Sequence, residues 1–116
     1  MDDKEFEQLV KEAIDSLPLE FAKKLNNVAV TVEGEPTPYQ LRKSGLQPWA
    51  LLFGLYQGVP QTKRGIYYSS LPDKITIFKN SILRVSRTAE EVRAQVRATV
   101  IHEIGHHFGL SDKELK

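Results

Sequence analysis

The sequence of this 116-residue chain predicts an α+β fold, in which a small mixed β-sheet is backed by helices and a functional site lies on the last long helix. Three observations support this. Residues 4–17 have apolar side chains at helical spacing, residues 28–32 alternate valine with other residues, and residues 89–108 lie between a helix-capping sequence and a glycine. Because no repeat or linker separates these segments, we expect a single domain over residues 1–116.

The first expected helix covers residues 4–17. Its apolar residues recur every three or four positions and therefore share one face: Phe6, Leu9, Val10, Ile14 and Leu17. Pro18 is suited to the first turn of a second, short helix that extends to Leu25, because its missing N–H needs no partner there.

Strands are expected in three places. The stretch NVAVTVEG places Val28, Val30 and Val32 on one face and ends at Gly34. The stretches LLFGLYQGVP (residues 51–60) and KITIFK (residues 74–79) are the second and third strands, and GIYYSS (residues 65–70) is a further candidate. Residues 34–50 contain three prolines and two glycines and are expected to form a long surface loop.

The clearest expected element is the helix over residues 89–108. Thr88 and Glu91 have the spacing of a capping box, in which each side chain binds a backbone N–H at the start of the helix. Gly109 is suited to end the helix, because glycine adopts the left-handed conformation without strain.

The composition limits the classes of function. The chain has no cysteine, so metal ligands must come from His, Asp and Glu. Its formal net charge of +1 does not favour a nucleic-acid partner. No apolar run is long enough to cross a bilayer, and the N-terminus lacks the apolar core of a signal peptide. We therefore expect a cytoplasmic protein with no membrane partner.

The stretch HEIGHHFGLSD, residues 102–112, contains all three histidines of the chain. A helix turns about 100° per residue, so His102 and His106 lie roughly 40° apart on successive turns and can converge on one ion. Glu103 flanks that ion and is placed to take a proton from metal-activated water. His107 is expected to point away from the ion, which excludes it as a ligand.

The other side of these turns is apolar, and a third ligand is expected after the helix. Ile101, Ile104 and Phe108 are expected to face the core. A left-handed Gly109 would turn the chain back beneath the site, where Leu110 could pack on Ile104 and Asp112 could reach the metal. The pattern H-E-x-x-H-x-x-G-x-x-D thus predicts one zinc ion per chain. Its oxygen ligand would also accommodate manganese or iron.

Several alternatives to this interpretation remain open. His102 and His106 could be an exposed helical pair, with Glu103 in a salt bridge to Arg93, Arg97 or Lys113. Asp112 could instead belong to the first turn of a short helix with Ser111 and Glu114 as its capping box, and have no role in metal binding.

Some other residues have functional or structural interpretations of their own. Four tyrosines could donate to an oxyanion but are more typical of packing: Tyr39, Tyr56, Tyr67 and Tyr68. Trp49 is expected to anchor the core, and Lys63-Arg64 to form a solvated turn.

Three stretches together resemble a family of small bacterial zinc metallopeptidases with a minimal zincin fold: LLFGLYQGVP, LPDKITIFKNSILR and VRATVIHEIGHHFGLSD. The resemblance is clear over residues 51–112. It implies a short mixed sheet over an active-site helix, zinc held by His102, His106 and Asp112, and Glu103 as the general base. It also implies that the KITIF strand borders the cleft. In larger zincins an edge strand there pairs with an extended peptide substrate.

The sequence departs from the larger peptidases at one point. Those with the longer motif have a methionine-containing turn beneath the metal, whereas the only methionine here is Met1, so we expect the floor of the site to be built from other residues. The first hypothesis is a zinc-dependent peptidase acting on a peptide or protein substrate. The second is a metal-stabilised module that binds a protein partner through Leu46 and Trp49. A metal-dependent RNA-processing hydrolase is the third.

Overall fold

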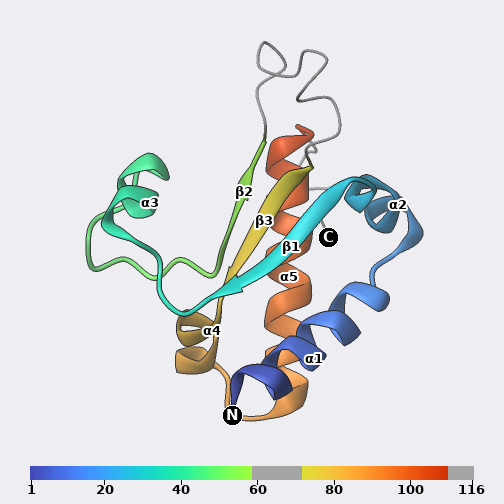
Figure 1. The fold of residues 1–116 in the computed structure, drawn as a ribbon, viewed down its shortest axis with the longest axis horizontal. Helices are drawn as coiled ribbons and strands as arrows, with labels where there is room; N and C mark the ends of the chain where they lie inside the picture. Colours follow the sequence, from blue (N-terminus) through green and yellow to red (C-terminus); the bar gives the residue numbers. More distant parts are fainter. Residues whose placement is uncertain (59–71, 110–116) are drawn as a thin grey trace.

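A mixed β-sheet lies at the centre of the computed structural model, which describes residues 1–58 and 72–109 (Figure 1). In spatial order the strands of these residues are β1 (Val28–Glu33), β3 (Asp73–Phe78) and β2 (Gly54–Gln57). The central strand β3 runs parallel to β1 and antiparallel to β2, so that Ile75 has Val30 on one side and Tyr56 on the other. The predicted α+β class with a small mixed sheet is confirmed.

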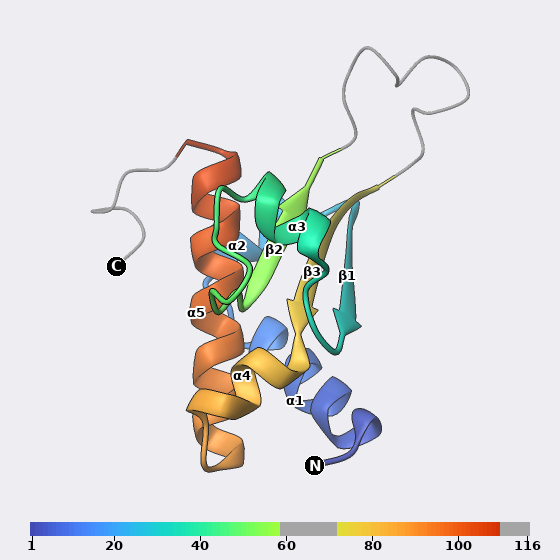
Figure 2. The same cartoon turned by 90° about the vertical axis from the view of Figure 1, so that its left-hand side faces the viewer.

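Helices lie on one face of this sheet, at one end of its strands and beyond its β2 edge (Figure 1 and Figure 2). They are α1 (Asp3–Asp15), α2 (Leu19–Ala22), the 3₁₀ turn η1 (Lys23–Leu25), α3 (Pro38–Lys43), α4 (Lys79–Val85) and α5 (Ala89–His107). Figure 1 shows α5 behind the strands, with α1 against its lower half and α3 outside the β2 edge. The side view in Figure 2 confirms that α5 runs along one face of the sheet. Among the described helices, none has the length and apolarity needed to cross a membrane.

The core joins α1, the sheet and α5. Its fully or almost fully buried side chains include Phe6, Val10, Ala13, Ile75, Ile77, Val92, Val96, Val100 and Ile104. The apolar face predicted for the first helix therefore packs as expected. At the surface of the same contact, Arg93 Nη1 of α5 lies 3.1 Å from Glu12 Oε1 of α1.

The prediction of a structureless loop over residues 34–50 was wrong in part, because this segment contains α3. Thr37 Oγ1 accepts a hydrogen bond from Gln40 N, and Gln40 Oε1 accepts one from Thr37 N. Pro38 occupies the first helical turn, where a missing N–H costs nothing. The prolines that suggested a loop therefore include one that starts a helix.

Two side chains expected in the core are exposed. Trp49 is 80% exposed, so the prediction that it anchors the core was wrong. Phe108 is 45% exposed and is the residue after the last full turn of α5, where the helix has passed the edge of the core. The prediction that Phe108 faces the core with Ile104 was therefore also wrong.

The strand predictions differ in accuracy. β3 occupies the expected place, and its Ile75 and Ile77 are both 0% exposed. β2 covers only four residues of the predicted 51–60 segment, since Leu51 to Phe53 are irregular although Phe53 O still accepts from Phe78 N at 2.9 Å. The candidate strand at residues 65–70 lies outside the described residues.

The long helix was predicted almost to the residue. Thr88 Oγ1 accepts from Glu91 N at its start, and Gly109 has a left-handed φ of 70° after its end. The capping box is modified, because the carboxylate of Glu91 accepts from the N–H of Arg87 instead of that of Thr88.

A close approach between β2 and α5 fixes the distance of the sheet edge from the long helix. A Cβ atom at Gly54 would lie 2.6 Å from Thr99 Cγ2 and 3.1 Å from Thr76 O. We therefore expect Gly54→Ala to destabilise the fold by about 1–3 kcal/mol, the usual cost of overpacking, in urea denaturation.

A second substitution tests the cause of that loss. Thr99→Ser removes the clashing methyl group and keeps the hydroxyl that donates to Gln95 O at 2.8 Å. Adding it to Gly54→Ala should restore part of the free energy of unfolding. A Gly54→Ala variant as stable as the wild type would contradict the close approach.

Candidate metal centre

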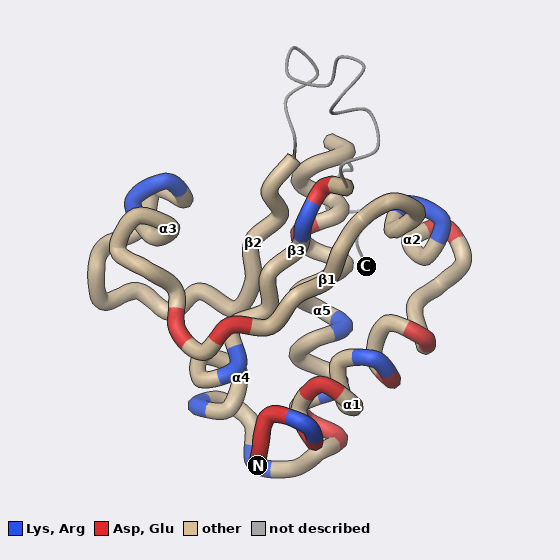
Figure 3. The backbone as a smooth tube through the Cα atoms, in the orientation of Figure 1, with Lys and Arg blue, Asp and Glu red and all other residues tan. Residues whose placement is uncertain are grey.

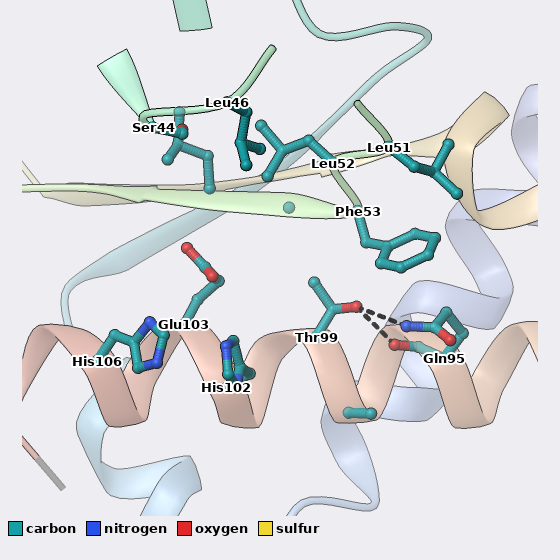
Figure 4. A pocket seen from close by; sticks show the side chains of 13 residues that line it. Ser44, Leu46, Leu51, Leu52, Phe53, Gln95, Thr99, His102, Glu103 and His106 are labelled. Carbon is teal, nitrogen blue, oxygen red and sulfur yellow. Dashed lines mark hydrogen bonds between the residues drawn. The ribbon is translucent and has the colours of Figure 1, made fainter. Parts of the chain in front are cut away.

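Two histidines and a glutamate near the end of α5 form a cluster, in which Glu103 points toward β2 (Figure 4). The candidate ligand atoms of His102, Glu103 and His106 all lie within 4.8 Å of one another. The ring centroids of His102 and His106 are 4.0 Å apart. Both rings are exposed and the Glu103 side chain is half-buried, so the group is open to an ion from solvent.

The part of α5 that carries His102 and Glu103 is anchored in the core on its other side. Ile104 is 0% exposed, and Ile101 packs against the same core cluster. His102 therefore projects from a fixed part of the helix, and His106 follows at the expected spacing of four residues, just beyond the last buried residues Ile104 and Gly105. Two imidazoles that converge from successive turns suit zinc as two of its protein ligands, so the histidines present fit the metal implied by the sequence.

Glu103 is held by the edge of the sheet. Its Oε1 accepts a hydrogen bond of 3.0 Å from the backbone N–H of Tyr56 in β2. Arg93, which the alternative interpretation paired with Glu103, instead contacts Glu12. The carboxylate thus has a fixed direction, toward the space between α5 and β2.

That space is a cleft of about 590 Å³. It is lined by Ser44, Leu46, Leu51, Leu52, Phe53, Gly54, Leu55, Gln95, Ala98, Thr99, His102, Glu103 and His106. The polar cluster occupies one end, and leucines and Phe53 stand over the end near Thr99 and Gln95 (Figure 4). Within this lining Glu103 is the one acidic side chain, and lysine and arginine are absent.

The strand that borders the cleft is not the one implied by the family resemblance. The KITIF strand, β3, is the centre of the sheet and is paired on both sides. The cleft is lined instead by Gly54 and Leu55 of β2, which is an edge strand in the described sheet. The resemblance was therefore wrong about which strand borders the site.

His107 lies apart from the histidine pair. Its ring stacks on Tyr56 with centroids 3.9 Å apart, as the helical spacing predicted for a residue that points elsewhere. The hydroxyl of Tyr56 donates to Asp73 Oδ2 at 2.7 Å. The link from Tyr56 to both Glu103 and His107 was not predicted, because a backbone donor on an edge strand leaves no signal in the residue type.

The other residues with a predicted role lie away from this cluster or outside the described residues. Tyr39 is 57% exposed on α3, where its hydroxyl accepts from Lys43 Nζ at 3.3 Å. Several predictions fall outside the described residues: Asp112 as third ligand, the packing of Leu110, the caps Ser111 and Glu114, and the roles of Lys113, Tyr67, Tyr68 and Lys63-Arg64. The left-handed Gly109 supplies the helix stop on which the return of Asp112 depends.

Comparison with known proteins identifies the class of this fold and site. The model of the zincin-like metallopeptidase family matches residues 25–116, and the chain belongs to that family. The family implies a metal, usually zinc.

A solved structure supports the same architecture. A conserved hypothetical protein from T. thermophilus is similar with 27% sequence identity and a TM-score of 0.57, over 93% of this chain and 94% of that one. No curated protein matches the chain.

Proposed function

We propose that this protein is a zinc-dependent peptidase in which His102, His106 and Asp112 hold one zinc ion and Glu103 is the general base. The observation that carries the proposal is the His102–Glu103–His106 cluster at the end of a cleft beside a sheet edge. Two imidazoles with a carboxylate bind zinc in many hydrolases, and an oxygen ligand also leaves room for manganese or iron. The role of Asp112 rests on the sequence pattern.

The β2 edge supports a peptide as the substrate. The N–H of Tyr56 points away from β3, because it bonds to Glu103, whereas Phe53 O points toward β3, where it accepts from Phe78 N. Backbone groups alternate along a strand, so the N–H and C=O of Gly54 also point away from β3. An extended peptide can add to such an edge through its own N–H and C=O groups.

Each group of the site has a task in peptide hydrolysis. Zinc supplies Lewis acidity, which polarises a carbonyl and increases the acidity of water. Glu103 removes a proton from the attacking water and transfers it to the amine that leaves. The hydrogen bond from Tyr56 N aims this carboxylate into the cleft before a substrate binds.

The lining of the cleft favours an apolar side chain near the cleaved bond. From His106 to Gln95 the helix wall extends about 16 Å, which is roughly five residues of an extended peptide. Residues 44–58 have no acidic or basic side chain, and Figure 3 shows β2 and the segment before it without charge. The zinc-loaded protein should therefore cleave a library of unstructured peptides preferentially beside leucine, methionine or phenylalanine.

Leu51→Glu tests that preference with little risk to the fold, since Leu51 is 39% exposed at the rim of the cleft. We expect kcat/KM for apolar peptides to fall by about 10-fold, the usual effect of losing one good apolar contact, with a relative gain for peptides with lysine. Leu19→Glu on α2 is the matched control, because Leu19 is 69% exposed and is not among the cleft residues. Sequencing of products by mass spectrometry gives both results. Absence of any metal-dependent cleavage would contradict the peptidase.

The alternative of a metal-stabilised binding module has one observation in its favour, the 80% exposed Trp49 in the predicted contact loop. A protein that binds zinc, cleaves nothing in the library and captures a partner through Trp49 would support it. The described cleft lining gives no support to RNA processing, because it has no lysine or arginine to neutralise phosphate.

A further inference from the structure

The last turn of α5 extends beyond the hydrophobic core. Ile104 and Gly105 are the last buried residues of the described helix, and His106, His107 and Phe108 are all exposed. A helix end without core contacts opens easily, with a free energy near zero. One of the two clustered histidines is therefore on a turn that the core does not hold.

Aromatic contacts with β2 hold this turn instead. The ring of His107 lies flat on the ring of Tyr56, with centroids 3.9 Å apart and an angle of 19° between the planes. Phe108 meets Tyr56 edge-on at 6.3 Å, and Lys24 Nζ lies 5.0 Å from the centre of the Phe108 ring. Each such ring contact contributes about 0.5–1.5 kcal/mol. The two contacts with Tyr56 fix the exposed turn to β2, and Lys24 links Phe108 to η1 by a cation–π contact.

Tyr56 is in turn fixed to the sheet. Its hydroxyl donates to Asp73 Oδ2 at 2.7 Å, and the same carboxylate oxygen lies 3.9 Å from His107 Nε2. A Cβ atom at Gly58 would approach His107 Cε1 to 3.2 Å, so the chain after β2 leaves little spare space beside the imidazole. The stacked rings of Tyr56 and His107 are therefore held by Asp73 and enclosed by the chain at Gly58.

The backbone of Tyr56 also binds Glu103, so one residue contacts both the candidate base and the neighbour of His106. Its N–H orients the carboxylate of Glu103, while its ring holds the residue next to His106. We propose that Tyr56 and His107 are positioning residues, an aromatic clasp that keeps His106 in the geometry needed for metal binding and keeps Glu103 directed into the cleft. This inference rests on the metal site of the proposed function, and it needs no metal contact by His107 itself.

Zinc affinity, measured by competition with a chromogenic chelator, tests the clasp. His107→Ala should weaken zinc binding about 10- to 100-fold, the usual effect of losing a group that orients a ligand. His107→Phe keeps a flat ring on Tyr56 and has no ring nitrogen, so it should restore most of the affinity. Tyr39→Ala removes an exposed tyrosine of α3 and should leave the affinity unchanged.

Hydrogen exchange of the zinc-free protein gives a second result that does not depend on the metal. In His107→Ala the amides of residues 105–109 should exchange faster than in the wild type, while those of the buried middle of α5 keep their rates. A general loss of stability would accelerate both sets. Faster exchange confined to the last turn therefore separates positioning from a role in the overall fold.

The outcomes are distinct. The clasp is overturned if His107→Ala binds zinc as tightly as the wild type, or if His107→Phe is as weak as His107→Ala, which would assign the role to the imidazole nitrogen. It is overturned as well if the wild type takes up no zinc. The peptidase fails separately, if zinc-loaded wild type cleaves no peptide. In that case the expected affinities of the two His107 variants would still support the clasp.

Discussion

Replacing Glu103 by glutamine is expected to lower peptide turnover by about 10²- to 10⁴-fold, the usual contribution of a general base. The amide cannot accept the proton of water. Its Oε1 can still accept the 3.0 Å hydrogen bond from Tyr56 N, so the side chain should keep its place in the cleft. The measurement is kcat of the zinc-loaded variant on a peptide that the wild type cleaves, together with its zinc content, which should be unchanged.

Glu90→Gln is the matched control, since Glu90 is an exposed glutamate in the first turn of the same helix. Its turnover should equal that of the wild type. If the Glu103→Gln variant were as active as the wild type, Glu103 would not be the base, and another group of the cleft would have to move the proton.

Replacing either histidine of the cluster by alanine should strongly lower the zinc content of the protein. His102→Ala and His106→Ala each remove one of the two rings that lie 4.0 Å apart. We expect each variant to lose zinc affinity by more than the roughly 10- to 100-fold that follows loss of an orienting group. The measurement is elemental mass spectrometry of protein purified without a chelator or a histidine tag. The wild type should carry about one zinc per chain.

Asp112→Ala belongs in the same experiment and tests the third ligand. A marked loss of zinc would support the H-E-x-x-H-x-x-G-x-x-D pattern as a three-ligand site. Full zinc content in this variant would exclude Asp112 as a ligand and leave the third position to another group.

His102 and His106 are both exposed, so neither His102→Ala nor His106→Ala should affect the fold. The midpoint of urea denaturation of each zinc-free variant checks this.

Much of the fold could be predicted because the relevant signals are local. Thr88 and Gly109 mark the two ends of α5, and capping depends only on residues within one turn of the helix. Ile75 and Ile77 are both buried, as the alternation in KITIFK predicted. The histidine pair was placed correctly for the same reason, since spacing along a helix determines which side chains meet.

The errors concern features that depend on distant parts of the chain. The centre of the sheet is β3 because β1 and β2 both pair with it, and the composition of a strand does not show its neighbours. Trp49 is exposed although tryptophan is usually well buried, because the segment after α3 runs outside the β2 edge. Tyr56 holds Glu103 through its backbone N–H, which any residue except proline would supply at this position.

The contact between α1 and α5 has a consequence for the order in which the molecule assembles. Glu12 and Arg93, which meet at that contact, are 81 positions apart. A helix of 13 residues such as α1 is marginal in water on its own, so it needs the apolar face of α5 to become stable. Contacts of such long range also slow folding. Because α5 is the last described element to leave the ribosome, the core that joins α1 to α5 cannot close until α5 has been made.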